Sequence, residues 1–502
     1  MIRIVIICSL ISVIKSNDCN FNADEVDALK TSFSDADEYI ERLVRNANRN
    51  AAIVVGPARS GKSTLINYLI GNKLTAYFPS KYDNLKIKKF DENSIGPEIG
   101  EGTVSKTSIP SKWNSAIFSN LDIWDSAGFD DSRGVKKDVN NSFYLHHLVK
   151  KVKTLKFVLV VSFEIITGNT EPFLALLRNL EIFLNGKFRI FFPSISLIIS
   201  KAPFEISNYK IDNEYIKRKL ERNIISQSNM TMSADVRDFV RHVKDNDNRI
   251  AFFRKARNNG LITSDIDDNI IGAIQNSYRI KMECLQDVGF SIAERTVTCL
   301  QKAYDTLNPM EEFMNMNDII NAFWREKFEF LHSKHIRNNA NMLNSTRNTY
   351  FTKENYINNT SWKNSSIFVK IEIIENSDDL FKQFIKNQDL KNKINRSIFI
   401  DTLLKKKQMN FLDMMAETFV YNISGKISQL IALCSSLLNQ LTIKQYRKQI
   451  KIMQASYAEI TQMLDRKIET LVLTEKEKSN WEIIKSDRIN NSPKKRSIKK
   501  LV

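Results

Sequence analysis

Residues 51–66 read AAIVVGPARSGKSTLI, and this stretch decides the fold of the first half of the chain. The apolar run over residues 51–55 predicts a buried strand, and the amphipathic pattern over residues 62–69 predicts a helix. The loop between them has the form Gly-x-x-x-x-Gly-Lys-Ser, in the strand, loop and helix setting that this motif requires. Gly56 and Gly61 allow backbone N–H groups to converge on phosphate oxygens at the amino end of a helix. The sequence therefore predicts a P-loop.

The P-loop residue types have separate expected roles toward a triphosphate and its Mg²⁺. Lys62 would neutralise the β and γ phosphates, Ser63 would ligate Mg²⁺, and Thr64 would help to hold the α phosphate. The expected nucleotide-binding residues of the loop are Gly56, Pro57, Ala58, Arg59, Ser60, Gly61, Lys62, Ser63 and Thr64.

A second motif, DIWDSAG over residues 122–128, places an acid and a glycine three positions apart at the end of a hydrophobic strand. Asp125 could hold Mg²⁺ through water, and the Gly128 N–H could contact the γ phosphate. The alternative is an ordinary aspartate that ends a strand. Its occurrence together with a P-loop favours the first interpretation.

Further strands and helices alternate as far as residue 257. The apolar runs predict buried parallel strands at residues 51–55, 121–124, 157–163, 195–199 and 250–253. Amphipathic stretches predict helices at residues 62–69, 143–152, 171–183 and 214–225, with another at 26–44. This order predicts an α/β fold, a doubly wound domain of three layers.

The second half of the chain is predicted to be helical. Of the 14 glycines, 12 occur at or before Gly272, and only two prolines follow Pro203, so turn signals are scarce. An apolar stripe predicts a long helix or a helical hairpin, used either for core packing or for a self-associating coiled coil. It comprises Ile423, Ile427, Leu430, Cys434, Leu437 and Leu441, and resumes at Ile450, Met453, Tyr457, Ile460 and Leu464. The Asn-rich stretch 338–366 lacks this periodicity and is expected to be a loop.

Through GPARSGKST at 56–64 and DSAG at 125–128, the chain resembles GTPases of the translation-factor-like class, especially the septin, dynamin and immunity-associated branches. The resemblance covers about residues 50–257. It implies a G domain that binds GTP and Mg²⁺ and that self-associates. Self-association through the helical region is the alternative that the apolar stripe offers. The resemblance also implies a hydroxyl ligand of Mg²⁺ in switch I, for which Thr103, Ser105 and Thr107 are candidates. Ser105 is favoured by its similarity to the Val-Thr-Lys or Val-Thr-Arg segments of those branches.

The motif that reads guanine in these GTPases, Asn-Lys-x-Asp, is replaced here by Ser200-Lys201-Ala202-Pro203. Lys201 could lie over the base, and Ser200 would stand beside it, but the aspartate is absent. The resemblance therefore leaves the choice between guanine and adenine open. Arg59 stands where guanylate-binding large GTPases, which this loop resembles, carry an arginine finger in cis. The expected catalytic residues are accordingly Lys62, Arg59 and Ser105, although Arg59 could also simply face solvent.

The predicted domains are a signal peptide at 1–16, an N-terminal helical segment at 17–50, the G domain at 51–262, a helical domain at 263–485 and a basic tail at 486–502. The apolar run from Ile4 to Ile14 is too short to span a bilayer, which favours secretion over a permanent anchor. A cytoplasmic location is the alternative. Cleavage of the signal peptide would remove Cys8. The remaining cysteines could form two disulfides or stay as thiols; they are Cys19, Cys284, Cys299 and Cys434.

The formal charge of +17 favours acidic partners, but the basic residues are spread along the chain. The partner could be a protein or a membrane surface. No nucleic-acid-binding module is recognised in the sequence, so binding to nucleic acid is not expected. The leading hypothesis is a slow Mg²⁺-dependent GTPase that acts as a nucleotide-controlled switch or assembly module. The alternatives are a secreted scaffold that binds nucleotide without turnover, and an ATPase.

Overall fold

The computed structural model of the protein describes residues 19, 21–45, 50–100, 109–126, 134–227, 231–407, 409–470 and 475–490. The chain divides into two compact units. The first, here called the sheet unit, is Met1–Asn308 with Asn395–Lys407, and the second, the helical unit, is Pro309–Ile394 with Gln408–Val502. Residues 263–308 thus cluster with the sheet, whereas the domain boundary drawn from the sequence lies at 262.

The sheet unit contains an eight-stranded sheet, mixed but mostly parallel, in the order β12-β10-β7-β6-β1-β5-β4, with β13 paired to β6. The five predicted strands are confirmed, and they run parallel to one another. They are β1 (Asn50–Val55), β5 (Asp122–Asp125), β6 (Thr154–Ser162), β7 (Ile195–Ala202) and β10 (Ile250–Arg254). Three short antiparallel strands complete the sheet: β4 (Ser111–Asn114), β12 (Asp267–Asp268) and β13 (Ile280–Lys281).

Helices cover both faces of this sheet, so the α/β prediction of three layers is confirmed. Because successive strand residues point to opposite faces, Ala51, Ile53 and Val55 join one buried cluster and Ala52 and Val54 join the other. The first cluster includes side chains from α2 (Ala23–Arg45), α4 (Val135–Lys151), α6 (Glu171–Phe183) and α9 (Ala234–Asp245). The second includes side chains from α3 (Lys62–Leu69) and α10 (Ile270–Asn276).

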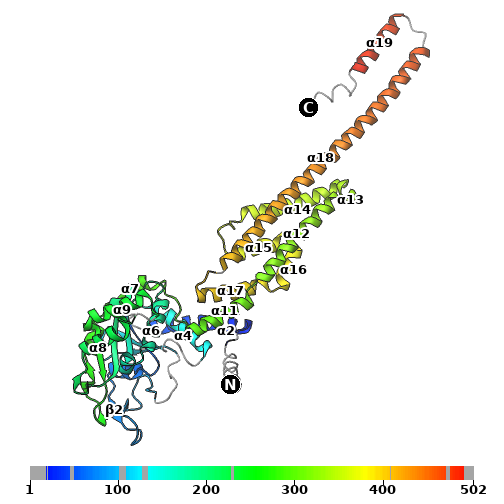
Figure 1. Ribbon diagram of the computed structural model, residues 1–502. Helices are drawn as coiled ribbons and strands as arrows, with labels where there is room; N and C mark the ends of the chain where they lie inside the picture. The colour runs from blue at the N-terminus through cyan, green and yellow to red at the C-terminus, as the bar shows by residue number, and fades with distance from the viewer. Residues whose placement is uncertain are drawn as a thin grey trace, which may run out of the picture. The chain divides into compact units, whose positions relative to one another are not determined.

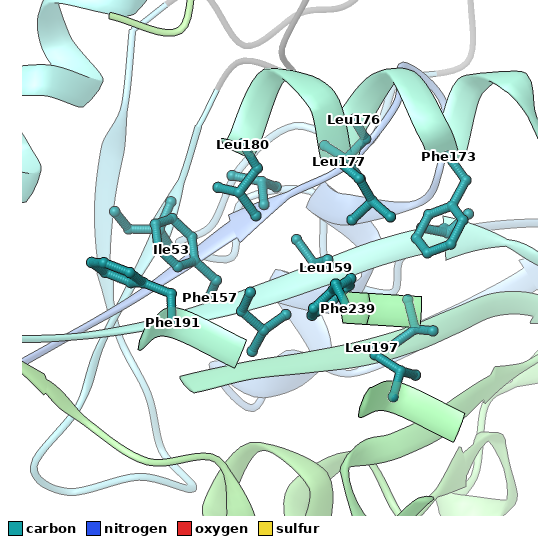
Figure 2. Packing of buried hydrophobic residues seen from close by; sticks show 14 of the residues in the cluster. Ile53, Phe157, Leu159, Phe173, Leu176, Leu177, Leu180, Phe191, Leu197 and Phe239 are labelled. Atoms are coloured by element: carbon teal, nitrogen blue, oxygen red, sulfur yellow. The ribbon is translucent and has the colours of Figure 1, made fainter. Parts of the chain in front are cut away.

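Helix α6 is amphipathic and packs one face on the sheet. Its buried residues Phe173, Leu176, Leu177 and Leu180 recur at spacings of three and four, which places them on one stripe of the helix. Figure 2 shows these side chains directed at Phe157, Leu159 and Leu197 of the strands below.

The sheet unit also contains further helices and two small sheets. Its other helices are α5 (Phe163–Thr167), α7 (Phe188–Phe191), α8 (Asn213–Leu220) and α11 (Glu294–Leu307). A second, three-stranded sheet consists of β2 (Leu74–Tyr77), β3 (Lys86–Lys89) and β11 (Gly260–Leu261), and a third is the pair β8 (Glu205–Ile206) and β9 (Tyr209–Lys210).

The helical unit contains no strand among its described residues (Figure 1). Its helices are α12 (Met310–His332), α13 (Lys334–Arg337), α14 (Ala340–Asn359), α15 (Ile367–Ser377), α16 (Asp379–Asn387), α18 (Met409–Thr470) and α19 (Glu475–Asn490). Helix α17 (Leu390–Leu404) is divided between the two units at residue 394. The prediction of a helical second half is confirmed from Pro309 onward.

The prediction of a loop over residues 338–366 was wrong, because 20 of these residues form helix α14. Its buried residues Leu343, Tyr350 and Ile357 are seven positions apart, which brings one side chain every two turns to the same face. That face packs on α18. The many asparagines between these three residues make the periodicity hard to recognise in the sequence. Burial of the three large side chains outweighs the weak helix propensity of the asparagines.

The apolar stripe at residues 423–464 belongs to one continuous helix, α18, so the hairpin alternative was wrong. Its first part packs within the helical unit, where Ile423, Ile427, Leu430, Cys434 and Leu437 are buried. In the second part Met453 and Ile460 are 56% and 50% exposed. Core packing therefore accounts for the first part only.

One disulfide, Cys19–Cys299, joins the segment before α2 to α11, while Cys284 and Cys434 are free thiols. No helix among the described residues has the length and apolar character needed to cross a bilayer. The predicted signal peptide at 1–16 and residues 491–502 of the predicted basic tail lie outside the described residues.

Candidate functional site

The candidate site lies where the strand order of the main sheet reverses. Strand β1 is central: β5, the next parallel strand along the chain, lies on one side of it, and β6, β7 and β10 lie on the other. Open α/β sheets bind ligands in the crevice at such a switch point, at the carboxyl ends of the strands. The loop of residues 56–61 leaves β1 at this point and leads into α3.

The backbone of the loop approaches the sheet so closely that a side chain is excluded at its first position. A Cβ atom on Gly56 would lie 2.1 Å from the Val160 carbonyl oxygen of β6. Two residues then adopt left-handed conformations, Arg59 with φ 62° and Gly61 with φ 87°. A left-handed arginine costs on the order of 1 kcal/mol or more, and such local strain is concentrated at functional sites.

Lys62, the first residue of α3, is directed back into the loop. Its Nζ donates hydrogen bonds of 3.0 Å to the carbonyl oxygens of both Gly56 and Pro57. Burial lowers the pKa of the Lys62 ammonium to about 8, and the carboxylate of Asp125 opposes this shift. A phosphate at the loop would give this desolvated charge an anionic partner.

Ser63 and Asp125 bring a hydroxyl and a carboxylate together beside Lys62. The Ser63 Oγ donates to Asp125 Oδ2 at 3.4 Å, and Asp125 is 1% exposed. The pairing of Asp125 with Val54 fixes the carboxylate at the end of β5 next to the loop. The neighbouring Ser126 Oγ donates to the Val54 carbonyl oxygen at 3.0 Å, which adds a second tie between the two strands.

The oxygens of Ser63 and Asp125 fit Mg²⁺ bound together with a phosphate better than they fit a bare ion. Mg²⁺ is usually held by one or two protein oxygens plus waters and substrate phosphates. The Ser63 hydroxyl and the Asp125 carboxylate supply this number of protein oxygens. Within the described part of the chain, no group of three or more His, Cys, Asp or Glu residues is arranged to hold a metal by itself.

A hydrogen bond joins the end of β7 to the loop of residues 56–61. The Ser200 Oγ donates to the Ser60 carbonyl oxygen at 2.5 Å, and both residues are buried. Lys201 follows in a left-handed conformation, with φ 55°, and is exposed. It interacts electrostatically with Glu164, Lys255 and Arg59. Ser200 and Lys201 therefore lie beside the loop, as a role in base binding would require.

The structure brings together the expected residues of the loop, Asp125, Ser200 and Lys201. Thr64 lies in the first turn of α3, next to Ser63. The other candidates, Thr103, Ser105 and Thr107 of switch I and Gly128, lie outside the described residues.

Two features of the site were not predicted from the sequence. Glu164, just after β6, lies with its Oε1 3.6 Å from Lys255 Nζ, just after β10. The contact depends on β6 and β10 flanking β7, and no local motif encodes that order. Ser126 was included in the DSAG motif, but its tie to β1 follows only from the strand pairing.

No protein-family model matches the chain, and no curated protein matches its sequence.

Proposed function

We propose that this protein binds GTP together with Mg²⁺ at the carboxyl end of β1 and hydrolyses it slowly, as a nucleotide-controlled switch or assembly module. One observation carries the proposal: Lys62, Ser63 and Asp125 converge beside a loop whose first position has no room for a side chain. The resemblance of GPARSGKST and DSAG to the translation-factor-like GTPases adds the expectation of guanine and of hydrolysis.

The loop would bind the phosphates by exchanging internal contacts for contacts to the ligand. Lys62 would move its two donated hydrogen bonds from the carbonyl oxygens of Gly56 and Pro57 to phosphate oxygens. The amino end of α3 would contribute N–H groups and the helix dipole, and no side chain among the described residues caps that end. Because Lys62 is buried, its attraction to phosphate is weakly screened by water.

Ser63 and Asp125 would hold Mg²⁺, Ser63 directly and Asp125 through water. The ion supplies charge neutralisation between the β and γ phosphates when it is bound. Arg59, exposed in the loop, would offset the charge that develops on the transferred phosphoryl group. Ser105 is the proposed switch I ligand.

Titration with fluorescent mant-GTP and mant-ATP, each with and without Mg²⁺, tests this proposal. We expect mant-GTP to bind more tightly in Mg²⁺, and Asp125→Asn to abolish most of that Mg²⁺ effect while leaving binding in EDTA nearly unchanged. A preference for mant-ATP would favour the ATPase alternative. Equal binding with and without Mg²⁺ would refute the assignment of Ser63 and Asp125.

A second candidate function is nucleotide binding without turnover in a secreted protein. The Cys19–Cys299 disulfide favours it, because such bonds persist in oxidising compartments. Phosphate release under saturating GTP separates the two candidates: turnover supports the GTPase, and tight binding with no release supports the scaffold.

A further inference from the structure

The small sheet of β2, β3 and β11 has one buried face and one exposed face. Leu74 and Ala76 of β2 are buried, and Leu74 contributes to the cluster beneath α3. The alternate residues Thr75 and Tyr77 pair with Lys88 and Lys86 of β3, and Thr75 also pairs with Leu261 of β11. The outer face therefore combines lysines with aromatic and aliphatic side chains.

Large apolar side chains cluster on this outer face and at the tip of the β2–β3 hairpin. Tyr82 is 85% exposed, Phe90 61%, Leu261 56% and Phe78 51%. Single exposed apolar residues are ordinary, but a group of four on or directly beside one short hairpin and its neighbouring strand indicates an interaction surface.

The charge of the hairpin indicates an anionic partner. Residues 72–90 contain five lysines and one acid, Asp83. Lys81 Nζ lies 4.9 Å from the centre of the Tyr82 ring, and Lys88 Nζ lies 5.3 Å from that of Tyr77. Lys88 also pairs with Glu92 at 3.2 Å, so that Lys81 and Lys86 are the more available charges.

Hydrogen bonds hold the base of the hairpin to α3. The Asn72 side-chain amide donates to Asn67 Oδ1 of α3 at 2.6 Å and to the Ile95 carbonyl oxygen at 2.7 Å. The Asn67 side-chain amide in turn donates to the Pro97 carbonyl oxygen at 2.8 Å. Both ends of the hairpin are thus fixed to one helix. The exposed side chains are presented on an ordered support, which reduces the entropy lost on binding.

We propose that this hairpin patch, defined as Phe78, Lys81, Tyr82, Lys86, Phe90 and Leu261, docks the protein on anionic lipid bilayers. Aromatic rings favour the interface between headgroups and acyl chains, and lysines bind the headgroup phosphates and carboxylates. Single-stranded nucleic acid also attracts lysines and aromatic rings. Leu261 favours lipid, because an aliphatic side chain does not stack on bases but does gain from burial among acyl chains.

Vesicle co-sedimentation of the full-length protein tests this proposal without reference to nucleotide. We expect binding to phosphatidylcholine vesicles that contain phosphatidylserine, weak binding to phosphatidylcholine alone, and loss of binding as the ionic strength rises. Each lysine near an anionic surface contributes a factor of about five in affinity. The double variant Lys81→Gln/Lys86→Gln should therefore bind roughly 25-fold more weakly.

The aromatic part of the patch is tested by the triple variant Phe78→Ser/Tyr82→Ser/Phe90→Ser. Its control is Phe351→Ser/Tyr356→Ser on α14, which removes two aromatic side chains that are 53% and 41% exposed outside the patch. We expect the triple variant to lose vesicle binding and the control to retain it.

Three outcomes would overturn the proposal: equal sedimentation with and without phosphatidylserine, unchanged binding of both patch variants, or binding of the patch to a single-stranded oligonucleotide in place of vesicles. The lysine variant decides the matter even if the aromatic variant is unstable, because both of its positions are exposed and changed to neutral side chains.

Discussion

The affinity for nucleoside triphosphate should fall as the pH rises from 7 to 9, because Lys62 loses its charge in that range. Burial sets the pKa of Lys62 at about 8 in the free protein. A bound triphosphate stabilises the charged form and raises that pKa, so binding takes up a proton above pH 8. With a free-state pKa of 8, about nine-tenths of Lys62 is charged at pH 7 and about one-tenth at pH 9. The apparent Kd should therefore increase about tenfold, or ~1.4 kcal/mol.

Fluorescence titration with mant-GTP across this pH range measures the effect. The phosphates are already ionised at the start of the range, since their last pKa is near 6, and should not contribute. Lys62→Arg provides the control: its guanidinium stays charged, so its profile should be flat even if its affinity is lower. A wild-type affinity that does not change between pH 7 and 9, or a Lys62→Arg profile with the wild-type slope, would refute the assigned role of Lys62.

Three further predictions address turnover, the disulfide and helix α14. Arg59→Ala should leave GTP affinity within about twofold while reducing phosphate release by on the order of a thousandfold, and equal loss of both would exclude an arginine finger. Cys19→Ser should lower the free energy of unfolding by about 2–4 kcal/mol in denaturant titrations, whereas Cys284→Ser, which changes a free thiol, should not. If a reductant leaves the free energy of unfolding of the wild type unchanged, this prediction is wrong. Leu343→Ala on α14 should lower the free energy of unfolding by about 2–5 kcal/mol, because Leu343 is buried. The adjacent, exposed Met342→Ala should lower it by less than about 0.5 kcal/mol, and equal effects of the two variants would argue against the packing of α14 on α18.

The strands and helices of the sheet unit could be predicted because their signals are local. Five apolar runs gave five parallel strands, and the predicted bounds of helices 62–69 and 171–183 agree with those of α3 and α6. The loop that follows β1 and the position of Asp125 at the end of β5 could be predicted in the same way, since each is contiguous in sequence with its strand.

Features that depend on pairing between distant segments could not be predicted. Cysteine spacing gives no information on the Cys19–Cys299 bond, which joins residues 280 positions apart. The contact between Glu164 and Lys255 requires β6 and β10 to flank β7, and the hairpin patch requires β11 to join β2. Helix α14 was missed for a different reason: three buried residues in a stretch of polar ones give too weak a periodicity.

The loop around Lys62 is expected to bind a triphosphate, and calorimetric titration of the full-length protein with a non-hydrolysable GTP analogue in Mg²⁺ tests this most directly. The wild type and Lys73→Ala, which removes an exposed lysine outside the loop, should bind alike. Lys62→Ala should bind at least about a hundredfold more weakly, because it removes a buried charge that meets the phosphates. Absence of heat with the wild type, or equal affinity for Lys62→Ala, would contradict this expectation.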